Sequence, residues 1–349
     1  MPFGETIIEW YQSHKRDLPW RRTTDPYKIW LSEIILQQTR VDQGLSYYQK
    51  FVKQYPTVHK LASAREHDVL KLWQGLGYYS RARNLHHAAK DVVNRFNGKF
   101  PSVYDDILSL KGVGEYTAAA IASFSFNQIY AVVDGNVFRV LSRYLGISEA
   151  VNGSSARRIF YDAAMQLMGN LPSHDFNQAI MEFGALQCKP LSPDCNQCPL
   201  QNSCFAFANN KVNMLPVKEK KAGVRSRYFN YLFIRKGGHV YMRRRTGNDI
   251  WKNMYDFPLI ETTKKISPKK ILQHEEWKKY FNGKTCHISS TSNIIKHQLT
   301  HQTIFARFFV IDTTMELKQA GIRRLNKKNI QRLAVPRLIE NFLKSSEHL

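Results

Sequence analysis

The chain has 349 residues, and its 51 lysines and arginines against 28 acidic residues give a formal net charge of +23. This excess is larger than solubility requires and indicates a polyanionic partner, with nucleic acid as the leading candidate. The first twenty residues hold no apolar run long enough for a signal peptide, and no later segment approaches the length of a membrane span. We therefore expect no membrane partner, a cytoplasmic location (nucleoid-associated in a bacterium), and two or three domains.

The first part of the chain carries helical patterns. Apolar residues recur at helical spacing from Asp25 to about Val52, after the N-cap and first-turn pair Asp25-Pro26, and predict one helix in which Gln38 interrupts the apolar stripe. Further helices are predicted at about 66–74, 81–96, 116–125, 136–145, 155–168 and 175–187. Because no comparable strand pattern precedes residue 212, residues 1–212 are predicted to be all-helical.

The character of the chain changes after residue 212. Residues 213–227 are polar and basic and contain Pro216 and Gly223, which predicts an exposed linker. Strands are predicted at 228–235, 239–245 and 305–311, and a closing helix at 336–343. Residues 228–349 are therefore predicted to form a separate, mixed α/β domain.

Four of the five cysteines fall close together. Cys188, Cys195, Cys198 and Cys204 form a C-x6-C-x2-C-x5-C array, and Cys286 stands apart. A disulfide framework is typical of small secreted domains, so this grouping indicates a metal centre instead. Ligand type alone leaves tetrahedral zinc and a [4Fe-4S] cluster as alternatives.

The segment from Leu110 to Ala118 contains the pattern of a helix-hairpin-helix turn. Gly112 and Gly114 allow a tight turn, and the amides at the start of the next helix can then point at a phosphate oxygen. Lys111 belongs to the same phosphate-facing turn. Such a turn positions a duplex without reading its sequence, and a plain helix-to-helix connection is the alternative for an isolated Gly-x-Gly.

Several motifs occur together in one order. They are the segments 18–21 (LPWR), 30–41 (WLSEIILQQTRV), 75–79 (GLGYY) and 133–137 (VDGNV), together with the hairpin and the cysteine array. Over nearly its whole length the chain resembles the MutY family of helix-hairpin-helix DNA glycosylases, to which endonuclease III is related. The resemblance implies a multidomain fold: an all-α glycosylase region with a [4Fe-4S] loop, followed by a Nudix-like domain over 228–349. Within 1–212 it implies a six-helix subdomain at about 20–130 and a cluster subdomain made of 1–19 and 131–212.

The resemblance also implies a reaction. It points to a base-excision repair enzyme that hydrolyses the N-glycosidic bond of adenine mispaired with 8-oxoguanine or guanine. Glu33 would be the general acid, Asp134 would stabilise the oxocarbenium ion, and Asn136 and Tyr116 would orient the groups around it. Tyr116 stands where bifunctional relatives have a Schiff-base lysine, so no obligatory lyase step is expected. Taken singly, Asp134 would be an N-cap and Glu33 a solvated helix residue.

Other residues match positions that handle the base and the duplex. Trp20 and Arg21 resemble residues that line the adenine pocket, and Gln178 is a weaker match for a base contact. Gln38 and Tyr78 match residues that wedge into the base stack when adenine is flipped out. As alternatives, Gln38 would bind a backbone carbonyl and Tyr78 would lie in the core.

The Nudix-like domain would check for 8-oxoguanine on the opposite strand. Bacterial relatives often have Phe-Ser-His in the lesion-reading loop, where this chain has Leu299-Thr300-His301. Thr300 and His301 retain a hydroxyl and an imidazole for the oxidised base, but the aromatic wedge is lost. The segment His274-Glu275-Glu276 lacks a Nudix hydrolase motif, so recognition without hydrolysis is expected. The implied partner is double-stranded DNA, bound by a monomer.

Two other functions account for part of the sequence. An endonuclease III-like glycosylase/lyase acting on oxidised pyrimidines would share the hairpin and the cysteines, but Tyr116 and the second domain argue against it. A non-catalytic iron-sulfur DNA-binding protein would explain the charge, the hairpin and the cysteines. It would leave Glu33 and Asp134 without a role.

Overall fold

The computed structural model describes residues 2–219, 223–282, 286–317 and 319–345. Residues 220–222 of the predicted linker lie outside this set. Contacts divide the chain into two compact units, Met1–Ser63 with Asn84–Lys221 and Ala64–Arg83 with Ala222–Leu349. The second unit thus takes its first twenty residues from within the region predicted as one helical domain. None of the described helices is both long and apolar enough to cross a bilayer.

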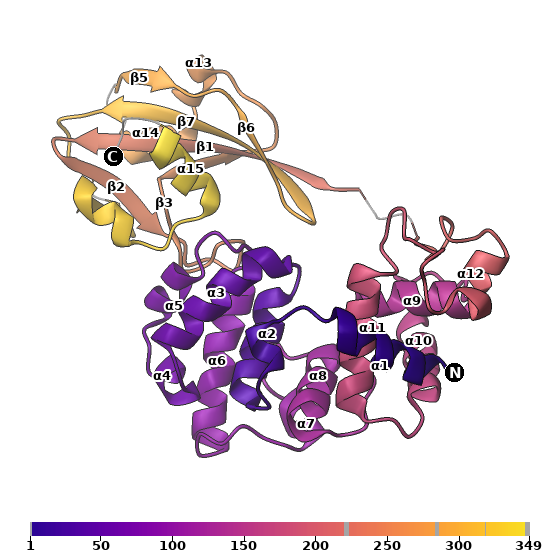
Figure 1. Cartoon of the computed structure of the whole chain (residues 1–349). Coiled ribbons are helices and arrows are strands. Elements are labelled where there is room, and N and C mark those ends of the chain that lie inside the picture. The colour runs from indigo at the N-terminus through magenta and orange to yellow at the C-terminus, as the bar shows by residue number, and fades with distance from the viewer. Residues whose placement is uncertain (1, 220–222, 283–285, 318, 346–349) are drawn as a thin grey trace. The chain divides into compact units, whose positions relative to one another are not determined.

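The described part of the first unit is helical, as predicted (Figure 1). Its α-helices are α1 (Phe3–His14), α2 (Pro26–Leu36), α3 (Val41–Gln54), α4 (Val58–Ala62), the larger part of α6 (Ser80–Arg95), α7 (Tyr104–Leu108), α8 (Glu115–Phe126), α9 (Gly135–Leu145), α10 (Ala156–Met168), α11 (Ser173–Leu186) and α12 (Phe205–Ala208). Short 3-10 turns lie at η1 (Pro19–Arg21) and η2 (Gln201–Ser203). The sequence patterns located five of these helices, α6 and α8 to α11, within two residues at each end, but they missed α1, α4, α7 and α12.

The prediction of one helix from Asp25 to Val52 is wrong, because the chain reverses between α2 and α3. Asp25 caps α2 as expected, accepting a hydrogen bond from the Tyr27 amide. Gln38 has a φ of +57°, a left-handed conformation that an α-helix cannot continue through. After this turn α3 packs against α2 so closely that a Cβ on Gly44 would come within 2.6 Å of Leu36 Cδ2.

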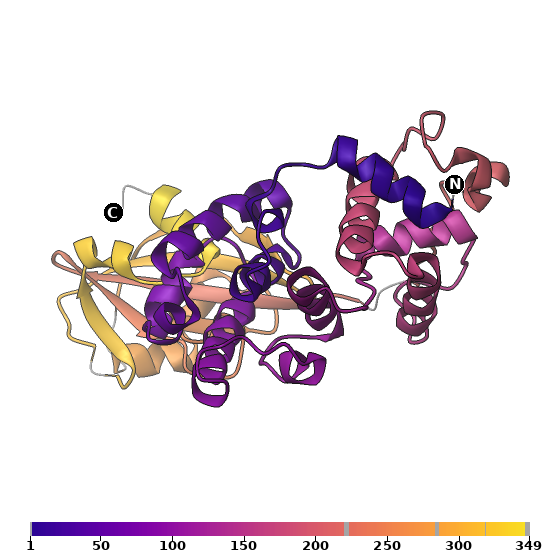
Figure 2. The same cartoon turned by 60° about the horizontal axis from the view of Figure 1, so that its bottom comes forward.

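The N-terminal helix shares a core with helices far along the chain. Helix α1, the indigo helix at the N-terminus, packs against α11 in both views (Figures 1 and 2). Trp10, Phe160, Phe176 and Phe183 belong to the buried cluster that joins α1, α9, α10 and α11. Separately, α2 packs against α8. These two sets of contacts fix the helices that supply the candidate site.

The second unit is built on one mixed sheet. Its strands are β1 (Arg225–Lys236), β2 (His239–Arg244), β3 (Tyr255–Asp256), β4 (Leu259–Thr262), β5 (Ile288–Thr291), β6 (Ile295–Gln298), β7 (Gln302–Asp312) and β8 (Ile322–Asn326). The order is β3-β2-β1-β7-β5; β4 pairs with β1, β6 with β7 and β8 with β2. Only β1 and β7 pair in parallel among the described strands. Strand β1 begins inside the segment predicted as a linker, and β3, β4, β5, β6 and β8 were not predicted.

Helices cover both faces of this sheet. The helices of the unit are α5 (Glu66–Leu72), the start of α6, α13 (Pro268–Ile271), α14 (Glu275–Phe281), η3 (Lys327–Arg332) and α15 (Arg337–Ser345). Side chains alternate along β1, so Leu232 and Ile234 pack with Trp277 of α14 on one face. Phe233 points to the other face, where its ring lies 5.4 Å from that of Phe342 in α15. The closing helix was correctly predicted.

Candidate active site

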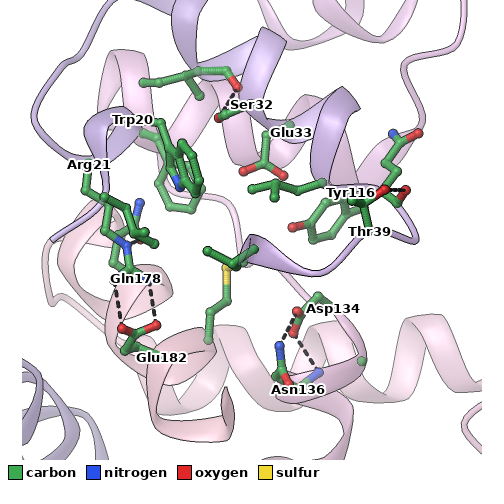
Figure 3. A pocket seen from close by; sticks show the side chains of 18 of the residues that line it. Trp20, Arg21, Ser32, Glu33, Thr39, Tyr116, Asp134, Asn136, Gln178 and Glu182 are labelled. Atoms are coloured by element: carbon green, nitrogen blue, oxygen red, sulfur yellow. Dashed lines mark hydrogen bonds and ion pairs between the residues drawn. The ribbon is translucent and has the colours of Figure 1, made fainter. Parts of the chain in front are cut away.

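A cavity of about 430 Å³ in the first unit collects the residues predicted for catalysis and for base binding, together with Gln38. It is lined by Trp20, Arg21, Glu33, Gln38, Tyr116, Asp134, Asn136 and Gln178, together with residues that were not predicted. In Figure 3 the Glu33 carboxylate points into the space between Trp20 and Tyr116, and Asp134 and Asn136 lie across from it. The fold therefore brings together predicted residues that are up to 158 positions apart in the sequence, Trp20 and Gln178.

Glu33 lies in the middle of α2 and is only 8% exposed. Burial raises the pKa of its carboxyl to about 7, with a smaller upward contribution from the charge of Asp134. Hydrogen bonding with Tyr116 and the charge of Arg21 act in the opposite direction. Glu33 is therefore not a solvated helix residue; it is a carboxylic acid able to give and take a proton near neutral pH.

Tyr116 is the second residue of α8 and faces Glu33. Burial raises its pKa well above the ordinary value, and the charges of Glu33 and Asp134 raise it further. The phenol thus keeps its proton beside the Glu33 carboxyl. It offers no amine that could form a Schiff base.

Asp134 caps α9 and lines the cavity at the same time. Its Oδ1 accepts hydrogen bonds of 2.8 Å from the amides of Asn136 and Val137, and its Oδ2 accepts one of 2.8 Å from Asn136 Nδ2. Burial raises the pKa of Asp134, and these three hydrogen bonds oppose the rise by favouring the anion. The N-cap role and a role at the site are therefore compatible.

Glu182 and Arg16 also line the cavity but were not predicted. The fully buried Glu182 carboxylate accepts hydrogen bonds of 2.9 and 2.6 Å from Arg16 and of 2.9 and 2.8 Å from Arg21. Burial would raise the pKa of Glu182, but the two guanidiniums outweigh it and lower the pKa to about 2. Arg21 Nε in turn donates to Gln178 Oε1 at 3.1 Å. Glu182 could have been recognised, because it lies four residues after Gln178 on the same face of a predicted helix.

The hairpin residues lie outside the cavity, in the exposed turn between α7 and α8. Gly112 has a φ of +82°, and a Cβ there would come within 2.7 Å of Asn84 Cβ and 2.9 Å of Asn84 Nδ2. Gly114 has no such constraint, since nothing lies within 4 Å of its Cβ position. Lys111 is exposed beside them. The turn geometry requires a glycine at one of the two positions only.

The other predicted DNA contacts belong to the second unit. Tyr78 follows Gly77, has a φ of +48° and is 46% exposed, so it is not a core tyrosine. Thr300 and His301 form the exposed turn between β6 and β7. The hydroxyls of Tyr78 and Thr300 are hydrogen-bonded to each other. A residue predicted to wedge into the base stack and a residue predicted to read the oxidised base are thus adjacent.

The four clustered cysteines surround one small cavity in the first unit. Cys188, Cys195, Cys198 and Cys204 line a space of about 30 Å³ together with Arg143. Arg143 Nη1 donates a 3.4 Å hydrogen bond to Cys188 Sγ. Four thiols with a guanidinium beside them fit a group held by thiolates, whose negative charge the arginine would offset.

Comparisons with known proteins agree with this architecture. A family model described as HhH-GPD superfamily base excision DNA repair protein matches residues 31–161, and one described as NUDIX domain matches residues 230–345. Among solved structures, a thermostable thymine-DNA glycosylase is 32% identical with a TM-score of 0.56, over 59% of this chain and 95% of that one. Endonuclease III in a non-covalent complex with DNA is 20% identical with a TM-score of 0.52, over 59% and 94%, and shares the fold.

Two bacterial relatives cover more of the chain. It is 36% identical to the adenine DNA glycosylase of Buchnera aphidicola subsp. Baizongia pistaciae (strain Bp), over 87% of this chain and 84% of that protein. It is 30% identical to that of Buchnera aphidicola subsp. Acyrthosiphon pisum (strain APS), over 98% of both chains. The adenine DNA glycosylase of Homo sapiens is 42% identical over 58% of this chain and 39% of its own length. The predicted fold class and family are confirmed: the chain belongs to the adenine DNA glycosylase family.

Proposed function

We propose that the enzyme removes adenine mispaired with 8-oxoguanine, and with guanine, from double-stranded DNA by hydrolysis of the N-glycosidic bond. The observation that carries this proposal is the buried Glu33, whose pKa of about 7 leaves it a proton donor at neutral pH, across the cavity from Asp134. Both groups come from one chain, so a monomer suffices.

Glu33 would protonate N7 of adenine as the bond from C1′ to N9 breaks and its electron pair leaves with the base. The Asp134 carboxylate would stabilise the positive charge that develops on the sugar, while Asn136 fixes its orientation through the 2.8 Å hydrogen bond. Water would then attack C1′ and pass its proton to the Glu33 carboxylate. Because Tyr116 has no amine, the product is an abasic site in an uncut strand.

The base itself would be held next to Glu33 by other residues of the cavity. Trp20 supplies an apolar face, and Arg21 and Gln178 supply a donor and an acceptor for the edge of adenine. Glu182 keeps Arg21 in place through its paired hydrogen bonds. Gln38, which lines the cavity, and the exposed Tyr78 would brace the duplex after the base has left the stack. Lys111, Gly112 and Gly114 would bind a backbone phosphate.

We further propose that Cys188, Cys195, Cys198 and Cys204 bind a [4Fe-4S] cluster. Within the described ranges, no three His, Cys, Asp or Glu side chains converge tightly enough for a single metal ion. Four thiols could hold either a cluster or one zinc ion with ligands at about 2.3 Å, and the resemblance to iron-sulfur glycosylases favours the cluster. The bound cluster would support the fold and carry one-electron redox chemistry, and excision would proceed through Glu33 and Asp134.

Recognition of 8-oxoguanine would depend on Thr300 and His301, which are exposed in the β6–β7 turn. Changing both to alanine should reduce the preference for 8-oxoguanine:adenine over guanine:adenine. The ratio of single-turnover rates on the two duplexes measures this preference. An unchanged ratio would remove these residues from lesion recognition.

The function is tested on duplexes that contain 8-oxoguanine:adenine or thymine glycol, with products resolved before and after alkali. We expect cleavage at adenine only after alkali, and we expect Glu33→Gln to slow it by about a hundredfold or more. Glu5→Gln, on the exposed side of α1, is the matched control and should leave the rate unchanged. Cleavage at thymine glycol without alkali would show that the proposed function is wrong.

A further inference from the structure

A second cavity, of about 850 Å³, adjoins the candidate active site in the first unit. It lies among α7, α8, α10 and the segments that precede α9 and α10. Tyr116, Val133 and Phe138 line both cavities, so these three side chains form a shared wall. A ligand in the second cavity would therefore lie one side chain away from the reacting groups.

Three tyrosines give this cavity an aromatic lining. The rings of Tyr104 and Tyr130 are stacked, with centroids 4.3 Å apart and planes 15° from parallel, and Tyr161 of α10 lines the same space. Both hydroxyls are partly shielded from water, and this burial raises the pKa of Tyr104 and of Tyr161. Aromatic side chains at such a site accept any nucleobase, because every base has a π-face on which to stack.

Two arginines stand at the rim of the cavity. Arg157 Nη1 pairs with Glu115 at 2.7 Å, and Arg158 lies 3.8 Å from Asp162. The arginine side chains are 67% and 91% exposed, and exposed ion pairs of this kind contribute little and exchange readily. Either guanidinium can therefore turn to a phosphate, for which its planar, multiple donors are suited.

We propose that this second cavity binds the nucleotide next to the target adenosine on the strand under repair, with its base against the tyrosines and its phosphate at Arg157 and Arg158. The inference rests on the proposed function and adds a second subsite to it. Neighbouring nucleotides of one strand are joined by a single phosphodiester. Two adjacent cavities that share one wall could therefore each hold one of two neighbouring nucleotides. Free adenine leaving the active site is the competing occupant.

The test is a double-mutant cycle between Tyr161 and the neighbouring base. Duplexes carry a 2′-fluoro-2′-deoxyadenosine target, which resists cleavage, and either a normal nucleotide or a base-free tetrahydrofuran on its 5′ or 3′ side. Tyr161→Ala should weaken binding about tenfold when the neighbouring base is present on one of these sides, and have no further effect when that base is absent. Tyr161→Phe, which keeps the ring, should bind like the wild type.

A loss of affinity that is equal with and without the neighbouring base, on both sides, would show a structural role for Tyr161 and overturn the inference. A second variant, Arg157→Gln with Arg158→Gln, alters exposed side chains only and should reduce the salt dependence of binding by one to two phosphate contacts. An unchanged salt dependence would contradict the phosphate contact. If Tyr161→Ala changes only the inhibition by free adenine, the cavity serves the product and the proposal fails.

Excision by the wild type on 8-oxoguanine:adenine is measured in the same series. If the wild type removes adenine while the cycle shows no coupling, the second subsite alone is rejected. If no adenine is removed, the proposed function has failed, whatever the binding data show.

Discussion

At the scale of single residues, the site depends on two buried glutamates whose pKa values move in opposite directions. Among the residues that the structure describes, no guanidinium lies within hydrogen-bond distance of Glu33, so burial dominates and its pKa rises to about 7. Glu182 is fully buried, but Arg16 and Arg21 lower its pKa to about 2. One carboxyl is therefore kept ready to donate a proton, while the other remains an anion that holds its neighbours.

Glu33→Gln should stabilise the protein at pH 8. Well below pH 4.5 the carboxyl is neutral in both the folded and the unfolded chain. Between about pH 4.5 and about pH 7 the unfolded chain releases the proton that the folded chain retains, so the wild type loses stability over this range and the loss is complete above about pH 7. The difference between the two pKa values corresponds to a loss of about 3 kcal/mol at most in the free energy of unfolding. Urea unfolding at pH 8 and pH 4 measures it, with Glu5→Gln as control. A variant no more stable than the wild type at pH 8 would contradict this.

Glu182→Gln should have the opposite effect. A carboxyl with a lowered pKa contributes stability above pH 4.5 and loses it as the pH falls through about 2. Because Arg16 is about one third exposed, we expect a loss of about 2 kcal/mol in the free energy of unfolding at pH 7. Urea unfolding should show a smaller difference from the wild type at pH 3. A difference independent of pH would mean that the side chain matters for packing alone.

The sequence indicated candidate site residues without explaining their chemical properties. Glu33 and Asp134 have no local signal that separates a catalytic carboxylate from an ordinary one, and only their place among family motifs indicated a role. The structure adds the physical cause, which is burial for Glu33 and three hydrogen bonds for Asp134. Arg16 was missed because its partner Glu182 is 166 positions away.

At the scale of elements, the turn between α2 and α3 determines which side chains line the pocket. Periodicity predicted one helix from Asp25 to Val52, because the apolar stripes of α2 and α3 happen to continue in phase. The left-handed backbone conformation of Gln38 ends the helical path there, and the Gln38 side chain lines the cavity. The periodicity of apolar residues predicts which face of a helix is buried. It does not reveal a single residue with positive φ that separates two helices. Short strands such as β3 and β4 were missed for a similar reason, since they are stabilised by pairing with distant strands.

The hairpin offers a matched pair of substitutions. Gly112→Ala places a Cβ at a φ of +82° and within 2.7 Å of Asn84 Cβ, whereas Gly114→Ala meets nothing within 4 Å. Gly112→Ala should therefore lower the free energy of unfolding by about 1 to 3 kcal/mol, and Gly114→Ala should change it by much less. Chemical denaturation of both variants checks the order. Equal losses would show that the turn does not depend on the conformation of Gly112.

At the scale of the whole molecule, a helical unit that holds the candidate pocket and cysteine cavity is followed in sequence by a Nudix-like unit with the exposed turn at Thr300. The division by contacts assigns residues 64–83 to the second unit, which a continuous reading of the sequence could not anticipate. Lys71 of that segment, for example, donates a hydrogen bond to the carbonyl of Leu333 within the second unit. This hydrogen bond joins a side chain to a backbone carbonyl 262 positions away.

The proposed [4Fe-4S] cluster predicts the metal content of the purified protein. Protein purified without oxygen should contain about four irons per chain and absorb near ~400 nm. Cys198→Ser should lose iron and weaken DNA binding more than it slows bond cleavage in the bound state. Cys286→Ser, outside the array, is the matched control and should retain the full iron content. Stoichiometric zinc in the wild type would overturn the cluster assignment.

The most direct test of the central claim is the pH dependence of the single-turnover rate of adenine removal from an 8-oxoguanine:adenine duplex. If Glu33 donates the proton, the rate should be highest where its carboxyl is protonated and should fall about tenfold for each pH unit above a midpoint near 7. Glu33→Gln should be slow at every pH and show no such midpoint. A wild-type rate that stays constant from pH 6 to pH 9 would contradict the assignment of Glu33 as the acid in this pocket.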